Sequence, residues 1–552
     1  MGIFYRLPGR QPQRRVNFMI RYQQLKMPLH YTMEDVREKI GTSLHIDPKS
    51  IRNLTLLRES LDARKKPELY YVLSAGFACD KEKALLQKYK KSGLILPYEE
   101  KELTLPLLSE KQKGQRPIVI GSGPAGLFCC YYLAKAGLSP ILIERGKDVD
   151  KRSKDVERFF ETGILDPESN VQFGEGGAGT FSDGKLTTSN KDPLGYQKEI
   201  LKLFVSMGAD ERILYEQKPH IGTDKLIEVV KNLRKEIISL GGEVLFETRV
   251  TDLIIEEDNE KRIKGVVLNG ERQLLSDQVV LAIGHSARDT FSMLYEKGFL
   301  LEAKPFAVGL RIQHPQEMID VSQYGSIHAG KLPAASYKLT AQAQNGRSVF
   351  TFCMCPGGYV INASSESGGL CVNGMSYSGR SGENANSAVI VSVTPDDFMD
   401  TDPLAGIRFQ RELEKKAYEL GKGAIPMQRL EDYEKNRPTE EAGSVSVCVK
   451  GQYAFSNLRG LLPKEAEEAF LDAMGQFDKK LKGFAHSDAL LSGIEARTSS
   501  PVRILRDGRG QALTIKGVYP CGEGAGYAGG ITSAAVDGLK TAIALLKNLG
   551  GI

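Results

Sequence analysis

Residues 118–126 read Ile118-Val-Ile-Gly121-Ser-Gly123-Pro-Ala-Gly126, a short apolar strand that runs into three glycines at Gly-x-Gly-x-x-Gly spacing. A helix is expected to follow. The first glycine permits a tight turn, the second lets the backbone approach a pyrophosphate, and the third lets helix and strand pack closely. The helix N-terminus adds free N–H groups and a partial positive charge. The stretch therefore predicts a dinucleotide-binding unit.

A second apolar strand begins at Pro140 and ends at Glu144, about 20 residues after Gly123. An acid at this strand end is expected to hold ribose hydroxyls. Strand, helix, second strand and acid in register favour dinucleotide binding over the alternative, a structural glycine-rich turn. The residues of this unit that we expect at the cofactor are Gly121, Ser122, Gly123, Pro124, Ala125, Gly126, Glu144 and Arg145.

Composition narrows the class of protein. The chain has 552 residues, 41% hydrophobic and 26% charged, which is close to the globular average. A formal net charge of +5 excludes a strongly basic nucleic-acid coat. No apolar run is long enough for a membrane span, so we expect none. The eight cysteines lack metal-ligand spacing, and we expect a reducing cytoplasm and no metal site.

The order of the segments predicts an α/β fold in four stretches. Residues 1–95 are expected to form a small N-terminal α+β domain. Residues 96–303 are expected to form the first part of a Rossmann-like cofactor domain, and residues 488–552 its C-terminal part. Residues 304–487, with strand-like and amphipathic helical runs, are expected to form an inserted α+β substrate domain, because an insertion of this kind usually walls the substrate pocket.

The later chain resembles the glutathione-reductase type of FAD-binding domain. A strand is predicted over 241–250, a meander over 251–268, and a strand that returns to the cofactor over 275–284. Residues 517–531 are glycine-rich and lead into a helix over 532–549. In that group an acid after a glycine, here Glu523, contacts ribityl or pyrophosphate oxygens, although Asp is more usual there. This resemblance implies FAD as the cofactor and contacts at Val250, Gly284, Gly522, Glu523, Gly530 and Ile531.

Further motifs resemble a bacterial family loosely named FAD-dependent (or FAD-utilising) dehydrogenases. They are the stretches 170–186, 218–224, 353–359 and 497–503. The resemblance covers essentially the whole chain. Because the family's name describes its fold and cofactor rather than an established substrate, it strengthens the prediction of FAD and says little about the reaction.

Residues 174–185 contain five glycines beside hydroxyl and ammonium donors. Unshielded backbone N–H groups can form an anion-binding concavity or lie against a flat ring. A donor near the flavin would stabilise its reduced anion. We favour a flavin-contacting loop over a mobile surface loop, and the expected contacts are Gly177, Gly179, Thr180, Ser182 and Lys185.

No catalytic residue is identified by the sequence. Cys353 and Cys355 would face one side of a regular strand, but a bridge between positions i and i+2 would be strained, so we interpret both as buried small side chains. Cys129 and Cys130 are predicted to pack on the first helix.

Four further polar residues have a functional and a structural interpretation. His220 and His285 are interpreted as hydrogen-bonded structural residues, although His285 follows Gly284 directly. Arg380 suits an acidic substrate and a solvated loop equally well. For Arg497 a structural use is at least as good an interpretation as an anion-binding one.

These features predict an FAD-dependent oxidoreductase that transfers a hydride or an electron pair to or from a small organic substrate. A second Gly-x-Gly-x-x-Gly after a strand is missing, so NAD(P)H, if used, is expected to bind transiently. One alternative is a flavin-dependent tRNA-modifying enzyme, motivated by basic residues in 6–21 and 64–66. Another is a flavin-binding sensor or assembly protein without turnover. The weak net charge makes nucleic acid the less favoured partner.

Overall fold

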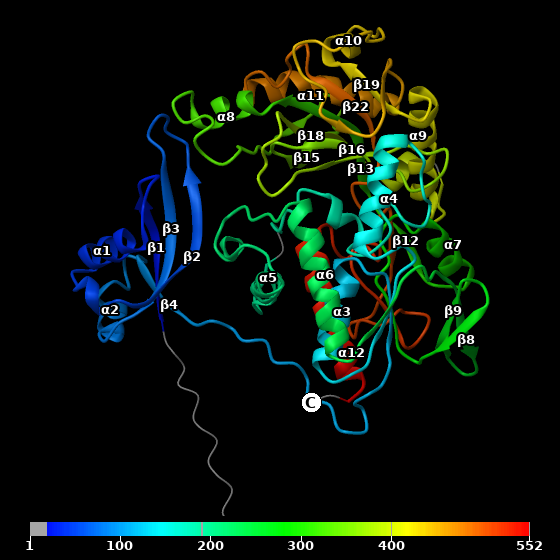
Figure 1. Cartoon of the computed structure of the whole chain (residues 1–552), viewed down its shortest axis with the longest axis horizontal. Coiled ribbons are helices and arrows are strands. Elements are labelled where there is room, and N and C mark those ends of the chain that lie inside the picture. The colour runs from blue at the N-terminus through cyan, green and yellow to red at the C-terminus, as the bar shows by residue number, and fades with distance from the viewer. Residues whose placement is uncertain (1–18, 189–190, 399, 551–552) are drawn as a thin grey trace, which may run out of the picture. The chain divides into compact units, whose positions relative to one another are not determined.

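The computed structural model describes residues 19–188, 191–398 and 400–550 (Figure 1). The chain forms two compact units. The first ends at Glu102 and also includes Leu214–Gln217; the second comprises Leu103–Ile213 and the chain from Lys218 onward. None of the helices in the described ranges has the length and apolarity that crossing a membrane would need.

The first unit is a four-stranded antiparallel sheet with two helices, in the order β2-β3-β1-β4. Its elements are β1 (Met19–Met27), α1 (Met33–Leu44), β2 (Arg52–Asp62), β3 (Tyr70–Ala78), α2 (Glu82–Lys88) and β4 (Ile95–Tyr98). Thr32 caps α1 and exchanges hydrogen bonds with Asp35 in a capping box. Alternating residues of β1, including Ile20 and Tyr22, pack against Val36 of α1. The α+β prediction for this segment is confirmed.

The second unit is built around a five-stranded parallel sheet in the order β24-β11-β5-β6-β7. Its strands are β5 (Ile118–Ile120), β6 (Ile141–Ile143), β7 (Glu243–Leu245), β11 (Val279–Leu281) and β24 (Val518–Pro520). The strands are short and, apart from the edge strand β7, fully apolar, as expected for a parallel sheet covered on both faces. Within β5, Val119 points to the helices and its two neighbours point to the opposite layer.

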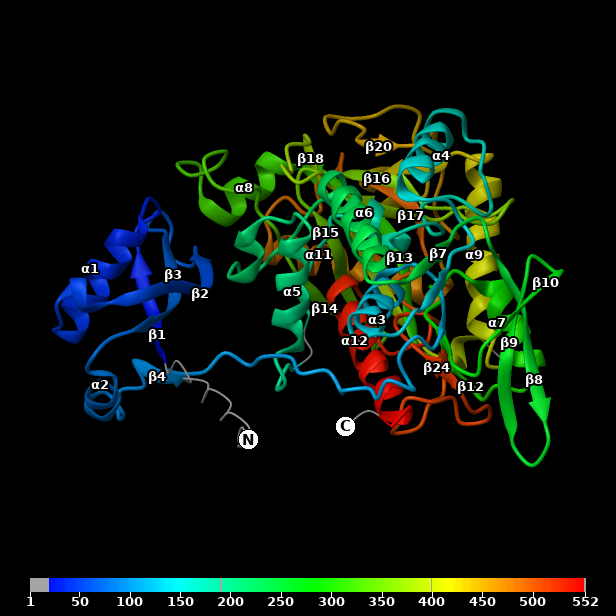
Figure 2. The same ribbon diagram turned by 60° about the horizontal axis from the view of Figure 1, so that its bottom comes forward.

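Helices cover one face of this sheet and a β-meander covers the other (Figure 2). The helices are α3 (Pro124–Lys135), α5 (Tyr196–Ser206), α6 (Thr223–Ser239) and α12 (Ile531–Asn548). The meander consists of β8 (Val250–Glu257), β9 (Lys261–Leu268) and β10 (Arg272–Leu275). Gly538 of α12 lies so close to α3 that a Cβ there would come within 2.2 Å of the Ala125 carbonyl oxygen. The predicted meander is confirmed, whereas the strand predicted over 241–250 is shorter, because only Glu243–Leu245 pair with β6.

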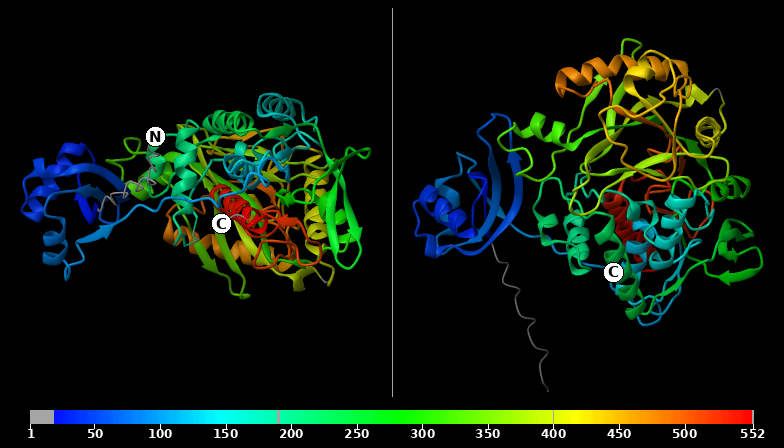
Figure 3. Two further views of the ribbon diagram at one scale, coloured as in Figure 1. Left: turned by 90° about the horizontal axis from the view of Figure 1, so that it is seen from below. Right: turned by 45° about the horizontal axis from the view of Figure 1, so that its top comes forward.

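The inserted segment forms a seven-stranded sheet in the order β14-β15-β18-β13-β22-β19-β21. Its strands are β13 (Phe306–Pro315), β14 (Thr340–Gln342), β15 (Ser348–Cys355), β18 (Asn384–Val393), β19 (Ile425–Arg429), β21 (Tyr453–Phe455) and β22 (Leu490–Glu495). The helices α9 (Ala405–Gly421) and α11 (Lys464–Lys480) bury their apolar faces in this layer, with α11 lying across the sheet (Figure 3). The strand β22, beyond the predicted boundary at residue 487, completes the sheet by pairing with β13 and β19.

The remaining elements connect these layers. They are α4 (Val149–Thr162), α7 (Arg288–Glu296), β12 (Leu301–Ala303), α8 (Gln316–Tyr324), β16 (Tyr359–Asn362), β17 (Val372–Met375), α10 (Leu430–Glu434), β20 (Val449–Lys450) and β23 (Val502–Ile504). The architecture confirms an α/β fold in which a Rossmann-like sheet is split by an inserted α+β layer.

Candidate functional site

The first glycine loop connects β5 to α3 as the sequence predicts. Gly121 has a φ of +99°, which favours glycine, and a Cβ on Gly126 would lie 1.8 Å from the Gly121 carbonyl oxygen. At Gly123 a Cβ would meet only the Cα of Gly177, 4.0 Å away. The open space therefore lies at Gly123, which is expected to face a pyrophosphate. The close packing contact lies at Gly126, which is expected to pack helix against strand.

The C-terminal glycine segment meets this loop. Gly522 follows β24 with a φ of +80°, and a Cβ there would come within 2.5 Å of the Ala125 Cβ. Its N–H donates to Asp537 over 2.8 Å. Nothing lies within 4 Å of a Cβ built on Gly529 or Gly530, where α12 begins. The convergence of two distant glycine clusters, on which the prediction of a shared cofactor crevice depends, is thus present in the fold.

The loop 174–185 joins the same place. A Cβ on Gly177 would come within 3.0 Å of the Gly123 Cα, and one on Gly179 within 3.0 Å of an Ile531 side-chain carbon. Thr180 and Ser182 turn their hydroxyl groups to carbonyl oxygens of their own loop. Three glycine-rich stretches therefore meet with backbone exposed between them, which suits an elongated ligand that carries phosphates. A direct contact of the two hydroxyls with the cofactor stays a prediction.

Glu144 is already fully hydrogen-bonded within the protein. Its carboxylate accepts from the N–H and hydroxyl of Ser122 at 2.9 and 2.7 Å, and from the N–H groups of Gly146 and Gly174 at 2.9 and 3.0 Å. A carboxylate has about four acceptor sites, so these donors occupy them. Glu144 thereby ties the first glycine loop to the 174–185 loop. Its contact with ribose stays a prediction.

Three other residues predicted to contact the cofactor, Arg145, Val250 and Gly284, differ in what surrounds them. Arg145 forms ion pairs with Glu168 and Asp289 and lies over the ring of Phe173. Val250 is buried at the start of β8. Gly284 follows β11 and has nothing within 4 Å of a Cβ. Gly284 thus resembles Gly123 in its open surroundings, and no contact in the structure assigns Arg145 or Val250 to a ligand.

Glu523 and His285 face each other at the junction of the two glycine segments. His285 Nε2 lies 3.8 Å from a carboxylate oxygen of Glu523. Burial raises the pKa of Glu523 to about 7, against the opposing charge of Lys304. Burial and the neighbouring guanidinium groups lower the pKa of His285 to about 3. At neutral pH the imidazole is therefore neutral, and the carboxyl group is poised between its two protonation states.

A polar cluster lies at the C-terminal end of the 174–185 loop. Asp183 is buried between Lys185, at 3.1 Å, and Arg380, which forms two hydrogen bonds of 3.0 and 2.6 Å with it. Burial alone would raise the pKa of Asp183, but these two cations hold it well below its usual range. Lys185 also lies 3.9 Å from the sulphur of Cys355. The sequence left two interpretations of Arg380 open. In the structure its guanidinium group is bound to the buried carboxylate of Asp183.

Sequence reasoning did not find several charged residues that lie near Glu523 or near Cys353 and Cys355. Lys304, Arg311 and Glu495 come from the inserted layer or its borders and carry no motif. Arg497, for which a structural use was at least as good an interpretation as anion binding, forms paired hydrogen bonds with the buried Glu414. Cys129 and Cys130 are fully buried on α3, so their predicted packing role is confirmed.

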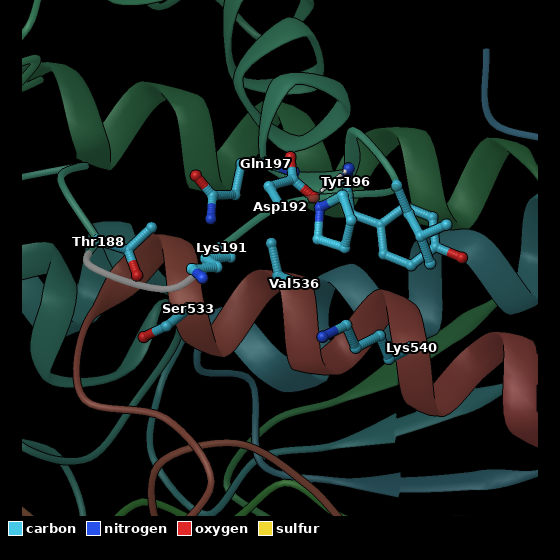
Figure 4. A pocket seen from close by; sticks show the side chains of 10 residues that line it. Thr188, Lys191, Asp192, Tyr196, Gln197, Ser533, Val536 and Lys540 are labelled. Carbon is cyan, nitrogen blue, oxygen red and sulfur yellow. Dashed lines mark hydrogen bonds between the residues drawn. The ribbon is translucent and has the colours of Figure 1, made fainter. Parts of the chain in front are cut away.

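A separate small pocket lies between α12 and a wall made by Thr188 and residues 191–197 (Figure 4). It is lined by Thr188, Lys191, Asp192, Pro193, Leu194, Tyr196, Gln197, Ser533, Val536 and Lys540. Its volume of about 60 Å³ is well below the roughly 300–1,000 Å³ typical of small-molecule sites. None of the predicted cofactor residues lines it, so it is a different feature from the glycine-lined site.

Three family models match parts of the chain. One described as FAD-dependent protein, C-terminal domain-like, matches residues 305–498. An NAD(P)-binding Rossmann-like domain matches residues 119–163, and a domain of unknown function matches residues 19–78. An uncharacterised protein of Clostridium beijerinckii is 44% identical over 527 residues, which cover 95% of this chain and 98% of that protein.

Solved structures resemble the chain weakly. Glycine oxidase from Bacillus cereus is 11% identical, with a TM-score of 0.33, over 79% of this chain and 95% of the oxidase. L-proline dehydrogenase from P. horikoshii is 11% identical, with a TM-score of 0.36, over 80% of this chain and 95% of the dehydrogenase. Likenesses at this level decide nothing about the reaction.

Proposed function

Because the chain belongs to the family of FAD-dependent proteins that includes the Clostridium beijerinckii relative, we propose that it transfers a hydride or an electron pair between FAD and a small organic substrate. The family resemblance read from the sequence motifs is confirmed, and FAD is the cofactor. The family is oxidoreductase-like, whereas the substrate and the direction of electron flow belong to the proposal.

The observation that supports the proposal best is the meeting of three glycine-rich stretches at one place. The open side of Gly123, the uncapped start of α12 at Gly530 and the exposed backbone around Gly177 would hold the cofactor. When bound, FAD supplies a ring that takes up or gives away an electron pair. Lys185 of the 174–185 loop and the partly buried carboxyl of Glu523 are charged groups of this chain that would tune that ring and move a proton.

NAD(P)H is proposed as a transient electron donor rather than a resident ligand. In the described ranges, the sheet around β5 is the only wholly parallel sheet of three or more strands. The first glycine loop of this sheet belongs to the proposed FAD site. Because the described ranges offer NAD(P)H no second parallel sheet of this kind, NAD(P)H would bind briefly over the flavin and dissociate after transferring its hydride.

The tRNA-modification alternative finds no specific support. Arg6, Arg10, Arg14 and Arg15 lie outside the described residues. Arg64 forms paired hydrogen bonds with Asp62, so part of the charge of that basic turn is neutralised. We therefore do not propose nucleic acid as the substrate.

The proposal is tested on the purified protein by its absorbance spectrum and by anaerobic mixing with NADH and with NADPH. We expect a yellow protein, or one that becomes yellow with added FAD, and bleaching of the flavin by one of the two donors. A colourless protein that takes up no FAD would refute the proposal. A tightly held flavin that is neither reduced nor reoxidised by any acceptor would favour the sensor alternative.

A further inference from the structure

Cys353 and Cys355 lie on a bulge rather than on a regular strand. The pairing of β15 with β18 shifts between Phe352 and Cys355, and Cys353 has a φ of +45°, in the left-handed region. In a regular strand, the Cα atoms of positions i and i+2 lie roughly 6.6 Å apart, at the upper end of the separations that a disulfide spans. At the bulge, the Cys355 thiol donates to the Cys353 carbonyl over 3.3 Å. The sequence argument against a bridge assumed a regular strand at these two residues, and the structure has a bulge there instead.

Two cations face this pair of thiols. Lys185 Nζ lies 3.9 Å and Arg311 Nη1 lies 4.0 Å from the sulphur of Cys355. Both are also bound by carboxylates, Lys185 by Asp183 and Arg311 by Glu495. Positive charge beside a thiol favours the thiolate, which is the reactive form. The two sulphurs therefore lie in surroundings suited to thiol–disulfide exchange.

The thiols of Cys353 and Cys355 differ in the direction of their pKa shifts, and Cys353 also differs in this from the six other cysteines. A hydrogen bond from the Cys355 side chain, with Lys185 and Arg311, lowers the pKa of Cys353 although burial opposes it. The same hydrogen bond and burial raise the pKa of Cys355. All eight cysteines lie in the described part of the chain, and burial raises the pKa of the six others. Cys353 is only half-buried, so the more acidic thiol is also the more accessible one.

The pair is close to the residues that would hold FAD. Lys185 belongs to the loop whose Gly177 contacts Gly123. Cys353 is near enough to Glu523 that its charge helps to raise the pKa of that carboxyl. The thiols and the cofactor-binding loops thus share one region of the second unit.

We propose that Cys353 and Cys355 form a redox-active dithiol that exchanges an electron pair with FAD, which makes a disulfide or dithiol compound the substrate class. The inference rests on the proposed function, because FAD must first accept an electron pair from a donor such as NAD(P)H. The internal S–S bond then takes up that pair and one proton, leaving Cys353 as a thiolate and Cys355 as a thiol, while FAD returns to its oxidised form.

The substrate half of the reaction balances by ordinary thiol–disulfide exchange. The Cys353 thiolate attacks one sulphur of the substrate disulfide, whose other sulphur leaves as a thiolate and takes up a proton. The Cys355 thiol then loses its proton and attacks Cys353, which releases the second substrate sulphur and restores the internal S–S bond. One donor hydride and one proton thereby reduce one substrate disulfide to two thiols.

Electron counting on the intact, FAD-loaded protein tests the proposal. After mild oxidation with diamide and removal of the reagent, anaerobic dithionite titration should consume a second electron pair per FAD in the wild type. Cys353→Ser and Cys355→Ser should each consume one pair. Cys371→Ala removes another buried thiol of the inserted segment and should behave as the wild type. Uptake of one pair by the wild type would overturn the proposal.

Mass spectrometry of the wild type gives a second measurement that needs neither a variant nor bound FAD. After diamide and alkylation, the peptide that contains both thiols should be two hydrogens lighter and unalkylated at 353 and 355, with Cys371 alkylated once the protein is denatured. Alkylation of both positions would overturn the dithiol even if FAD binds normally. A closed bridge in a protein that takes up no FAD would support the dithiol while refuting the proposed function.

The substrate class is probed with hydroxyethyl disulfide. Under anaerobic conditions this probe should reoxidise the reduced wild-type protein at least about tenfold faster than Cys353→Ser. Equal rates in the two proteins would overturn the assignment of the substrate class.

Discussion

Gly123 and Gly177 face each other: a Cβ built on Gly177 would come within 3.0 Å of the Gly123 Cα, although the two residues belong to different loops. Gly123 is the N-cap of α3, and Gly177 is the first residue of the short 3-10 helix η2 (Gly177–Phe181). Their contact brings two stretches of backbone together without side chains between them. The surface that would accept phosphates is therefore made by both loops.

Gly123→Ala should weaken FAD binding without unfolding the protein. Its φ of −69° suits alanine, and the added methyl group would meet nothing closer than 4.0 Å in the protein. The methyl group would instead occupy the space that a pyrophosphate needs. We expect the dissociation constant of FAD to rise at least tenfold, about 1.4 kcal/mol, measured by fluorescence titration of the FAD-free protein.

Gly126→Ala provides the contrast. Its methyl group would lie 1.8 Å from the Gly121 carbonyl oxygen, so we expect a loss of about 1–3 kcal/mol in the free energy of unfolding, even without FAD. Urea unfolding of both FAD-free variants checks this. Equal destabilisation by the two substitutions would contradict the division of tasks between these glycines.

Glu144→Gln should destabilise the FAD-free protein. The amide nitrogen of glutamine would face N–H donors that now reach a carboxylate oxygen. We expect the free energy of unfolding to fall by about 1–3 kcal/mol, measured by urea unfolding. Glu168→Gln, which changes an exposed carboxylate that pairs with the largely buried Arg145, should cost at most about 1 kcal/mol. If Glu144→Gln changed FAD affinity alone, the carboxylate would act mainly on the ribose.

A buried network should make stability depend on pH at the acidic end. Glu414 accepts paired hydrogen bonds from Arg288 and Arg497. Burial alone would raise its pKa, but these guanidinium groups hold the pKa at about 2, below the ordinary 4.5. The stabilisation is therefore complete above about pH 4.5 and is lost as the pH falls toward 2.

Glu414→Gln should remove that contribution at neutral pH. Two buried guanidinium groups would lose their carboxylate partner, and we expect a loss of about 3–5 kcal/mol. The difference between wild type and variant, measured by urea unfolding from pH 7 down to the lowest pH at which both fold, should shrink below pH 4.5. A difference that does not change with pH would contradict the low pKa.

Glu523 should make the free energy of unfolding fall as the pH rises, the opposite of the effect of Glu414. Its pKa is raised to about 7 in the folded protein from the ordinary 4.5, so its contribution to stability is complete below pH 4.5 and is lost as the pH rises through 7. We expect Glu523→Gln to gain up to about 3 kcal/mol over the wild type at pH 8 relative to pH 4.5. Urea unfolding of the two FAD-free proteins gives this difference. Parallel pH curves would show that the carboxyl ionises normally.

Local sequence determined the structure of the first glycine loop and of several elements around it. The spacing of the first glycine loop, the apolar strands beside it and the cap at Thr32 act over a few residues, where backbone sterics and helix capping decide the structure. The same holds for the predicted elements of the first unit and for the meander. These features were therefore predictable from short stretches of the chain.

Tertiary structure alone decided what those segments contact. Glu144 is a sequence-visible acid at a strand end, yet its oxygens are taken by Ser122 and by Gly174, which packing brings to it. The thiols of Cys353 and Cys355 look like strand residues until the bulge in β15 turns them and Lys185, 170 residues away, approaches. A charge or a kink supplied by a distant segment leaves no periodicity in the local sequence, because its energy comes from a contact that forms only when the chain is folded.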